Sequence, residues 1–239
     1  MINLEAVKLR TLANKPTLYK NLTIAPKTLN SIIDMGYEEY NHKLYIVNLA
    51  VENLLPPSEE AVKVDFSMIE LLMEADSDSL VAYLSAISFF IDEEIGLSPD
   101  MESLVIGKEK FSFEEVDVIT NIIKIQNCVV SKDDDNFNPL NENAKKLREK
   151  MLARQRKLRQ LKEDDNGDNS LSFLDLISVL CSNANGINLL NVFDLNFFQF
   201  NDQFNRMKLL DEYEVNIQAL LHGADSKNIK LKHWISKGE

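Results

Sequence analysis

The sequence predicts a mainly α-helical protein, and three observations carry this prediction. Apolar residues recur three and four positions apart along most of the chain, which is the spacing of one helix face. Residues that cap helices stand where several of these patterns begin. Glycine is scarce, with 7 among 239 residues, where about 7% is usual. We expect two helical units joined by a charged linker helix, with one small β-hairpin in the N-terminal unit.

The N-terminal unit is expected over residues 1–130. A short strand is predicted at 19–25, and a helix at 28–35 should end at Gly36, a residue suited to a helix stop. Further helices are predicted at 37–49, 67–76 and 79–91. The segment around Gly96, Pro99 and Asp100 is read as a loop.

A hairpin followed by a helix closes this unit. Residues 103–106 and 110–112 flank Gly107 and read as two short strands. Ser112 and Glu115 then form the signature of a capping box, which begins a helix. We expect one face of that helix to be buried, and its members are Val116, Ile119, Ile122, Ile123 and Gln126.

Residues 131–170 are expected to hold an acidic loop, a basic helix and a flexible linker. The stretch 144–162 carries nine Lys and Arg against one Glu, about +8 within a chain of net charge −12. Its apolar residues follow a heptad-like spacing. Three interpretations stay open: contact with nucleic acid, docking to an acidic protein surface, or a solvated linker helix.

The second helical unit is expected over residues 171–239. Phe173, Leu176, Ile177 and Leu180 share one helix face. Asp194 is the expected N-cap of a second helix that carries a phenylalanine cluster. A third helix is predicted with Tyr213, Ile217, Leu220 and Leu221 on one face and Gly223 at its stop. Trp234 is expected to dock a last short helix.

The search for catalytic chemistry predicts that the chain is not an enzyme and carries no cofactor. The seven glycines are never spaced as phosphate-binding loops require. The three histidines have no partner at metal-ligand spacing. Cys128 and Cys181 lie in apolar helical contexts and read as structural thiols. No apolar stretch has the length of a membrane span or a signal peptide, so a soluble intracellular protein is expected.

One weak metal pattern follows the basic stretch. Oxygen-bearing side chains occupy the ligand positions of an EF-hand-like calcium loop. Two features oppose a calcium site, because the turn position is Asn169 instead of glycine and the last ligand is a short aspartate. The alternative is a polar linker in which Ser172 caps the next helix. The six residues concerned are Asp164, Asn166, Asp168, Ser170, Ser172 and Asp175.

Two clusters are predicted to bind partners. One is apolar and lies on the second predicted helix of the C-terminal unit, where it is either a core face or a surface for a partner chain. The other is basic and lies in the linker. The apolar cluster and its neighbouring arginine are Phe197, Phe198, Phe200, Phe204 and Arg206; the basic cluster is Arg154, Arg156, Lys157 and Arg159.

Several stretches, taken in order and spacing, resemble the tail assembly chaperones of tailed phages and prophages of Gram-positive bacteria. They are IIDMGYEEY (32–40), LVIG (104–107) with the helix that follows, DLIS (175–178), VFDL (192–195) running on to QFNRM (203–207), and LKHWISK (231–237). The resemblance extends from about residue 26 to the C-terminus.

The resemblance implies a non-catalytic role in virion morphogenesis. Such chaperones act in the cytoplasm of the host bacterium, where they bind the tape-measure protein and recruit tail-tube subunits. Many are made in a short and a frameshifted long form. The chain could also form a homo-oligomer, and nucleic acid is a less favoured partner because the overall charge is acidic. The alternatives are a structural subunit of the mature tail or baseplate, and a nucleic-acid-binding regulator.

Overall fold

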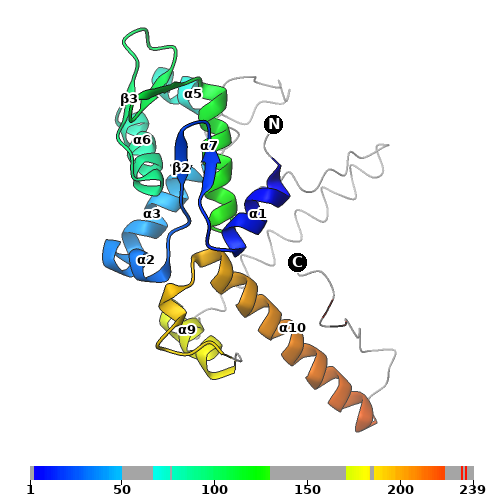
Figure 1. The fold of residues 1–239 in the computed structure, drawn as a ribbon. Coiled ribbons are helices and arrows are strands. Elements are labelled where there is room, and N and C mark those ends of the chain that lie inside the picture. Colours follow the sequence, from blue (N-terminus) through cyan, green and yellow to red (C-terminus); the bar gives the residue numbers. More distant parts are fainter. Residues whose placement is uncertain are drawn as a thin grey trace, which may run out of the picture.

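The computed structural model describes residues 3–49, 67–75, 77–129, 171–183 and 186–223, together with His233 and Ile235. These residues form a helical body from which one long helix projects (Figure 1). The elements in chain order are α1 (Leu4–Leu12), β1 (Thr17–Tyr19), β2 (Leu22–Ile24), α2 (Leu29–Met35), α3 (Tyr37–Val47), α5 (Met68–Ala75), α6 (Ser77–Ile91), β3 (Ile95–Leu97), β4 (Leu104–Ile106), β5 (Glu109–Phe111), α7 (Phe113–Gln126), α9 (Phe173–Asn183), the 3₁₀ turn η2 (Val192–Asp194) and α10 (Phe197–Leu221).

Most of the predicted helices are confirmed, and their ends have identifiable causes. The Thr28 hydroxyl accepts a hydrogen bond from the backbone N–H of Ser31 and begins α2, which ends at Gly36 with φ of +97°. At α7 the Ser112 and Glu115 side chains form the predicted capping box. All five residues of the predicted α7 face are buried. Local sequence therefore determines these boundaries.

The predicted hairpin around Gly107 is confirmed, because β4 and β5 pair antiparallel. The described part of the chain also contains a second small antiparallel sheet, so this hairpin is not its only β-structure. β1 pairs with β2, where one strand was expected over 19–25. β3, β4 and β5 form a three-stranded sheet, in which Gly96 of β3 lies opposite Val105. Gly96 was expected in a loop. The strands are three residues long, which is too short for an alternating pattern to be recognised in the sequence.

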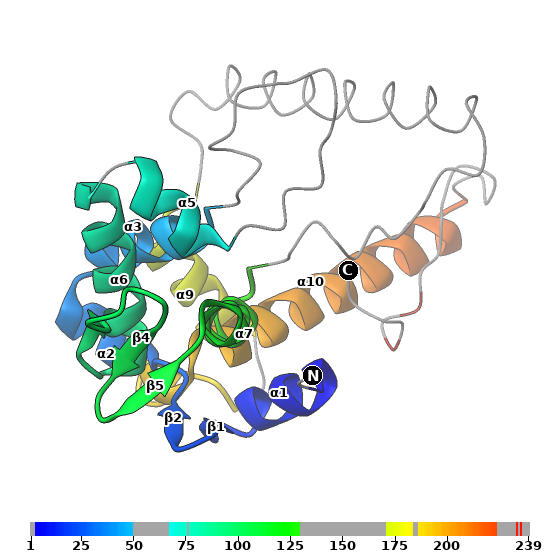
Figure 2. The ribbon, with the colours of Figure 1, turned by 90° about the horizontal axis from the view of Figure 1, so that it is seen from above.

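The core is a single hydrophobic cluster that extends from α1 to α10. α7 lies in the middle of the body, between α6 and α1 (Figures 1 and 2). Beside it the fully buried Tyr40 of α3 donates a hydrogen bond from its hydroxyl to Oδ1 of Asn127, at 2.7 Å. Burial raises the pKa of the Tyr40 phenol far above its ordinary value, so this hydroxyl stays a neutral donor.

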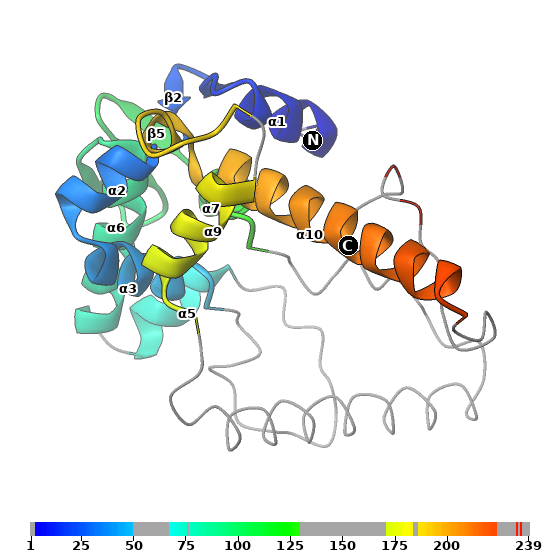
Figure 3. The ribbon, with the colours of Figure 1, turned by 90° about the horizontal axis from the view of Figure 1, so that it is seen from below.

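α10 differs from the prediction in its start and its length. Asn196 is its N-cap, whereas Asp194 belongs to the preceding 3₁₀ turn. The second and third predicted helices of the C-terminal unit are one helix of 25 residues. Its first half packs on α1, α7 and α9, and its second half projects from the body (Figures 2 and 3). No proline or glycine interrupts residues 197–221, so a continuous helix meets no local obstacle.

The N-terminal and C-terminal helices pack directly against one another. Leu29 of α2 donates a backbone hydrogen bond to the carbonyl of Leu195, at 2.8 Å, and Tyr37 stacks on Phe173 with ring centroids 4.5 Å apart. The predicted linker over 131–170, with its basic helix, lies outside the described residues. The domain boundaries at 130 and 170 stay predictions.

Candidate functional site

An apolar groove lies between α9 and α10. It has a volume of about 520 Å³. Figure 3 shows α9 lying across the first half of α10. The lining side chains are apolar in the floor and charged along the rim, and they are Leu171, Leu176, Val179, Asn183, Phe204, Met207, Lys208, Leu210, Asp211 and Glu214.

The α9 wall of the groove begins at a local cap. The backbone N–H of Ser172 donates to the Asp175 carboxylate at 2.8 Å, and the backbone N–H of Asp175 donates to the Ser172 hydroxyl at 3.2 Å. The Ser172 hydroxyl also donates to that carboxylate, which lowers the pKa of Asp175. From this start, residues at i, i+3 and i+7 face the groove, namely Leu176, Val179 and Asn183.

The same cap bears on the calcium-loop prediction. Asp175, the last of the six proposed ligands, uses its carboxylate to begin α9. Ser172 is its capping partner, as the alternative interpretation expected. Asp164, Asn166, Asp168 and Ser170 lie outside the described residues. Among the residues that are described, no group of three His, Cys, Asp or Glu side chains could hold a metal ion.

The α10 wall begins at a second capping box. The side-chain Oδ1 of Asn196 accepts from the backbone N–H of Gln199, and the backbone N–H of Asn196 donates to Oε1 of Gln199, both at 2.9 Å. The Asn196 amide also donates to the Thr11 carbonyl at 2.8 Å, and Gln199 donates to the Leu12 carbonyl at 2.8 Å. These bonds attach the first turn of α10 to the end of α1 and so position the groove.

The predicted phenylalanine cluster is divided between the core and the groove. Phe200 is 4% exposed and packs edge-on against Phe173. Phe197 of α10 lies beside Tyr40 of α3, with ring centroids 5.9 Å apart. This contact joins a C-terminal helix to an N-terminal helix. Phe204 contacts Phe200 and also lines the groove. Phe198 is half-buried and lies outside the groove lining and the hydrophobic cluster.

The remaining predicted binding residues are basic. Arg206 is exposed on α10, one position before the groove residue Met207. Arg154, Arg156, Lys157 and Arg159 lie outside the described residues.

Sequence reasoning missed most of the groove. It assigned Phe173, Leu176, Ile177 and Leu180 to one core face, although α9 is apolar on more than one side. Val179 lies on a second apolar side of α9 that is visible in the sequence. Leu171, just before α9, lines the groove with it. Leu210 was missed for a different reason, because the predicted break between two helices hid its continuity with Phe204 and Met207.

The two cysteines behave as structural thiols. Burial raises the pKa of the Cys128 thiol to about 11, so it is protonated at neutral pH. Burial also raises the pKa of Cys181. A thiolate is the nucleophilic and metal-binding form of cysteine, and neither side chain is poised to supply one.

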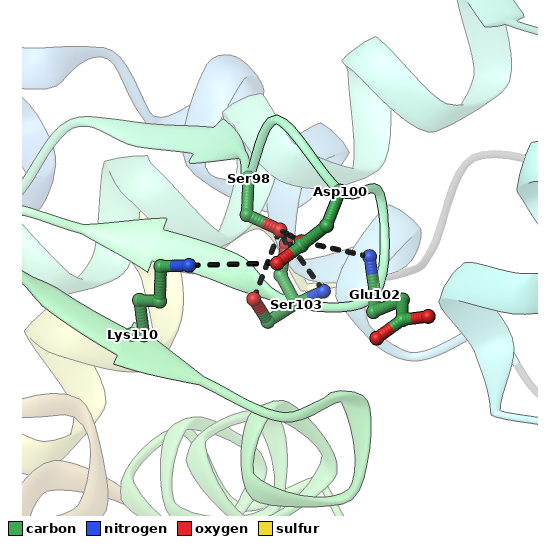
Figure 4. Close-up of polar contacts among 5 residues, drawn as sticks. All are labelled: Ser98, Asp100, Glu102, Ser103 and Lys110. Atoms are coloured by element: carbon green, nitrogen blue, oxygen red, sulfur yellow. Dashed lines mark hydrogen bonds and ion pairs between the residues drawn. The ribbon is translucent and has the colours of Figure 1, made fainter.

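A second polar cluster lies in the turn between β3 and β4 (Figure 4). The buried Ser98 hydroxyl donates to the Asp100 carboxylate, which lowers the pKa of Asp100. Ser98 accepts from the backbone N–H of Ser103 at 3.2 Å, and Lys110 lies 3.5 Å from the same carboxylate. The hydrogen bonds of Ser98 lie within this turn, and Lys110 approaches the turn from β5. We therefore assign the cluster a structural role.

Comparison with known proteins gives one match. Residues 162–239 match a family model described as the YomV second domain, and this range contains α9, α10 and the groove between them. The family is phage-derived, and the match suggests a phage or prophage protein. No curated protein and no solved structure matches the chain. Among the described residues, no helix is both long and apolar enough to cross a membrane.

Proposed function

We propose that the chain is a phage tail assembly chaperone that binds an amphipathic segment of the tape-measure protein in the groove between α9 and α10. The observation that carries this proposal is the groove itself, which combines an apolar floor with a charged rim. The phage-derived family model covers both walls of the groove and supports a phage setting. The sequence resemblance to tail assembly chaperones supplies the partner, and it also implies recruitment of tail-tube subunits.

The groove suits a helical occupant. The groove runs along α9 (Phe173–Asn183), and a helix of that length covers about 16 Å, or three turns. An amphipathic helix binds such a groove through apolar residues at i, i+3, i+4 and i+7. Asp211 and Glu214 on the rim favour basic residues beside that apolar stripe. The net charge of −12 would help to keep a loaded complex in solution.

Co-expression with the tape-measure protein of the same phage or prophage tests the proposal. We expect the wild-type chain to keep the tape-measure protein in the supernatant and to co-purify with it. Val179→Glu places a charge in the groove floor and should abolish this capture. Leu174→Glu is the matched control, because Leu174 is 73% exposed on the same helix and does not line the groove. Circular dichroism of both variants reports whether α9 stays folded.

Two results would overturn the proposal. One is a tape-measure protein that stays insoluble and unbound beside a folded wild-type chain. The other is a stoichiometric amount of the chain in purified particles, measured by mass spectrometry, because a chaperone leaves before assembly ends. That second result would favour a structural subunit of the tail or baseplate. A tail-tube gene just upstream and a very long tape-measure gene just downstream would support the proposal.

A further inference from the structure

The projecting half of α10 carries an apolar stripe that the body does not cover. Leu209, Tyr213, Ile217 and Leu220 follow spacings of four, four and three, which place them on one helix face. All four are half-buried. They belong neither to the hydrophobic cluster nor to the side chains packed against it. We call these four residues the distal stripe.

A residue from the end of the chain already contacts this stripe. The His233 ring lies 5.1 Å from the Tyr213 ring, measured between centroids, with an interplanar angle of 55°. Its Nδ1 accepts a hydrogen bond from the backbone N–H of Ile235 at 3.2 Å. The two rings are twenty residues apart in sequence, so His233 lies back along α10 from Gly223.

The length of the segment after α10 allows this return. Nine residues lie between Gly223 and His233, and an extended chain over these ten residue steps reaches about 33 Å. Tyr213 lies only about 12 Å back along the helix axis from Leu221. Gly223 has φ of +92°, a backbone conformation that ends the helix and lets the chain leave its axis.

The composition of the same segment complements the stripe. Residues 224–239 contain Leu231, Trp234 and Ile235, and their four lysines outnumber two acidic residues. The projecting half of α10 carries Asp211, Glu212 and Glu214. Apolar contact and charge complementarity therefore favour the same pairing. The family model also runs through residue 239, so it treats this segment as one unit with α9 and α10.

We infer that the C-terminal segment, residues 224–239, docks on the distal stripe of its own chain, with Trp234 packed beside Tyr213 and Ile217. The stripe is then an internal contact surface, while the groove between α9 and α10 is left for a partner. This inference is independent of the proposed function, since it concerns a different face of α10 and needs no tape-measure protein.

The single tryptophan of the chain makes the inference directly measurable. We expect a blue-shifted Trp234 emission with slow acrylamide quenching in the full chain. Ile217→Glu should shift the emission to the red and raise the quenching constant several-fold. Val215→Glu is the matched control, because Val215 is 57% exposed and two positions away, about 200° around the helix. It should leave both quantities unchanged.

A second variant guards against local unfolding of α10. Tyr213→Ala removes the ring that contacts His233 and introduces a strong helix former. It should also expose Trp234, while far-UV circular dichroism stays at the wild-type value. If Ile217→Glu or Tyr213→Ala loses helical signal, the other of these two variants serves as the test.

Three results would overturn the inference. The first is a wild-type Trp234 that is quenched as fast as a free peptide of the same segment. The second is a protected Trp234 that none of the stripe variants exposes, which would place it on another surface. The third is a protection that weakens on dilution together with dissociation of a dimer in sedimentation, which would make a second copy the occupant.

Discussion

Asn196 makes more structural contacts than its place in the sequence indicates. Its side chain begins α10 through Gln199, and its amide donates to the Thr11 carbonyl at 2.8 Å and to the Asn14 side chain at 3.0 Å. The residue is fully buried. It therefore caps one helix and at the same time holds the end of another.

Replacing Asn196 separates these two roles. Asn196→Ala loses the cap and removes the side-chain donor of the Thr11 carbonyl, which keeps the backbone N–H of Asn14, so we expect a loss of about 2 kcal/mol in the free energy of unfolding. Asn196→Asp keeps the capping oxygen but places a buried carboxylate oxygen against the oxygens of Thr11 and Asn14. Urea denaturation at neutral pH should therefore show Asp to be clearly less stable than wild type. An Asp variant as stable as wild type would contradict the role of the amide.

Asp117 gives a prediction about pH. Burial raises the pKa of this carboxyl on α7, so the ionised form is unfavourable in the folded state. Its stabilising contribution is present at low pH, when it is protonated, and is lost as the pH rises through the raised pKa. We expect Asp117→Asn to raise the melting temperature at pH 7, and the difference from wild type to shrink toward pH 4.

The control for this titration is a carboxylate with the opposite shift. Hydrogen bonding to Lys20 lowers the pKa of Glu115, the third residue of α7. Glu115→Gln should therefore destabilise the chain at pH 7 and have less effect as the pH falls. The same sign of effect for both variants would contradict the assignment.

At the scale of the element, Gly36 forms the junction between α2 and α3. It ends one helix and precedes the next with φ of +97° and ψ of 120°, a conformation that L residues rarely adopt. An added Cβ would meet nothing closer than 3.9 Å, so the cost of a side chain there comes from the backbone alone.

Gly36→Ala should lower the free energy of unfolding by about 1 to 2 kcal/mol. Gly96→Ala is the matched control, because no atom lies within 4 Å of its Cβ position and its backbone has no positive φ. Thermal unfolding of the two variants compares them directly. Equal stability of both would show that the turn at Gly36 can relax around a side chain.

At the scale of the whole molecule, the aromatic cluster around Phe200 connects α9 and α10 with the N-terminal helix α3. Phe200 contacts Phe173 of α9 and Phe204 of α10, and through Phe197 the cluster reaches Tyr40 of α3. Phe200 is buried, while Phe173, Phe197 and Phe204 are half-buried and pack against the core. Folding of α9 and α10 should therefore be coupled to folding of the N-terminal helices.

Phe200→Ala tests this coupling. We expect a loss of about 3 to 5 kcal/mol, with one cooperative transition retained in denaturation followed by circular dichroism. Phe198→Ala, two positions earlier and outside the cluster, should cost much less. A separate early transition in Phe200→Ala would instead support two units that unfold independently, as the sequence led us to expect.

The sequence by itself determined the local features: the helical class, the start of α2 at Thr28, its stop at Gly36, and the capping box and buried face of α7. These depend on residues within a few positions of one another, so a local pattern contains them. Only the tertiary structure decided that Phe197 and Phe200 are largely core residues, that Asn196 attaches α10 to α1, and that Val179, Met207 and Leu210 line one groove. Those outcomes depend on contacts between segments more than a hundred residues apart or on two helices meeting, and an apolar residue has the same local pattern whether it faces a core, a groove or a returning chain end.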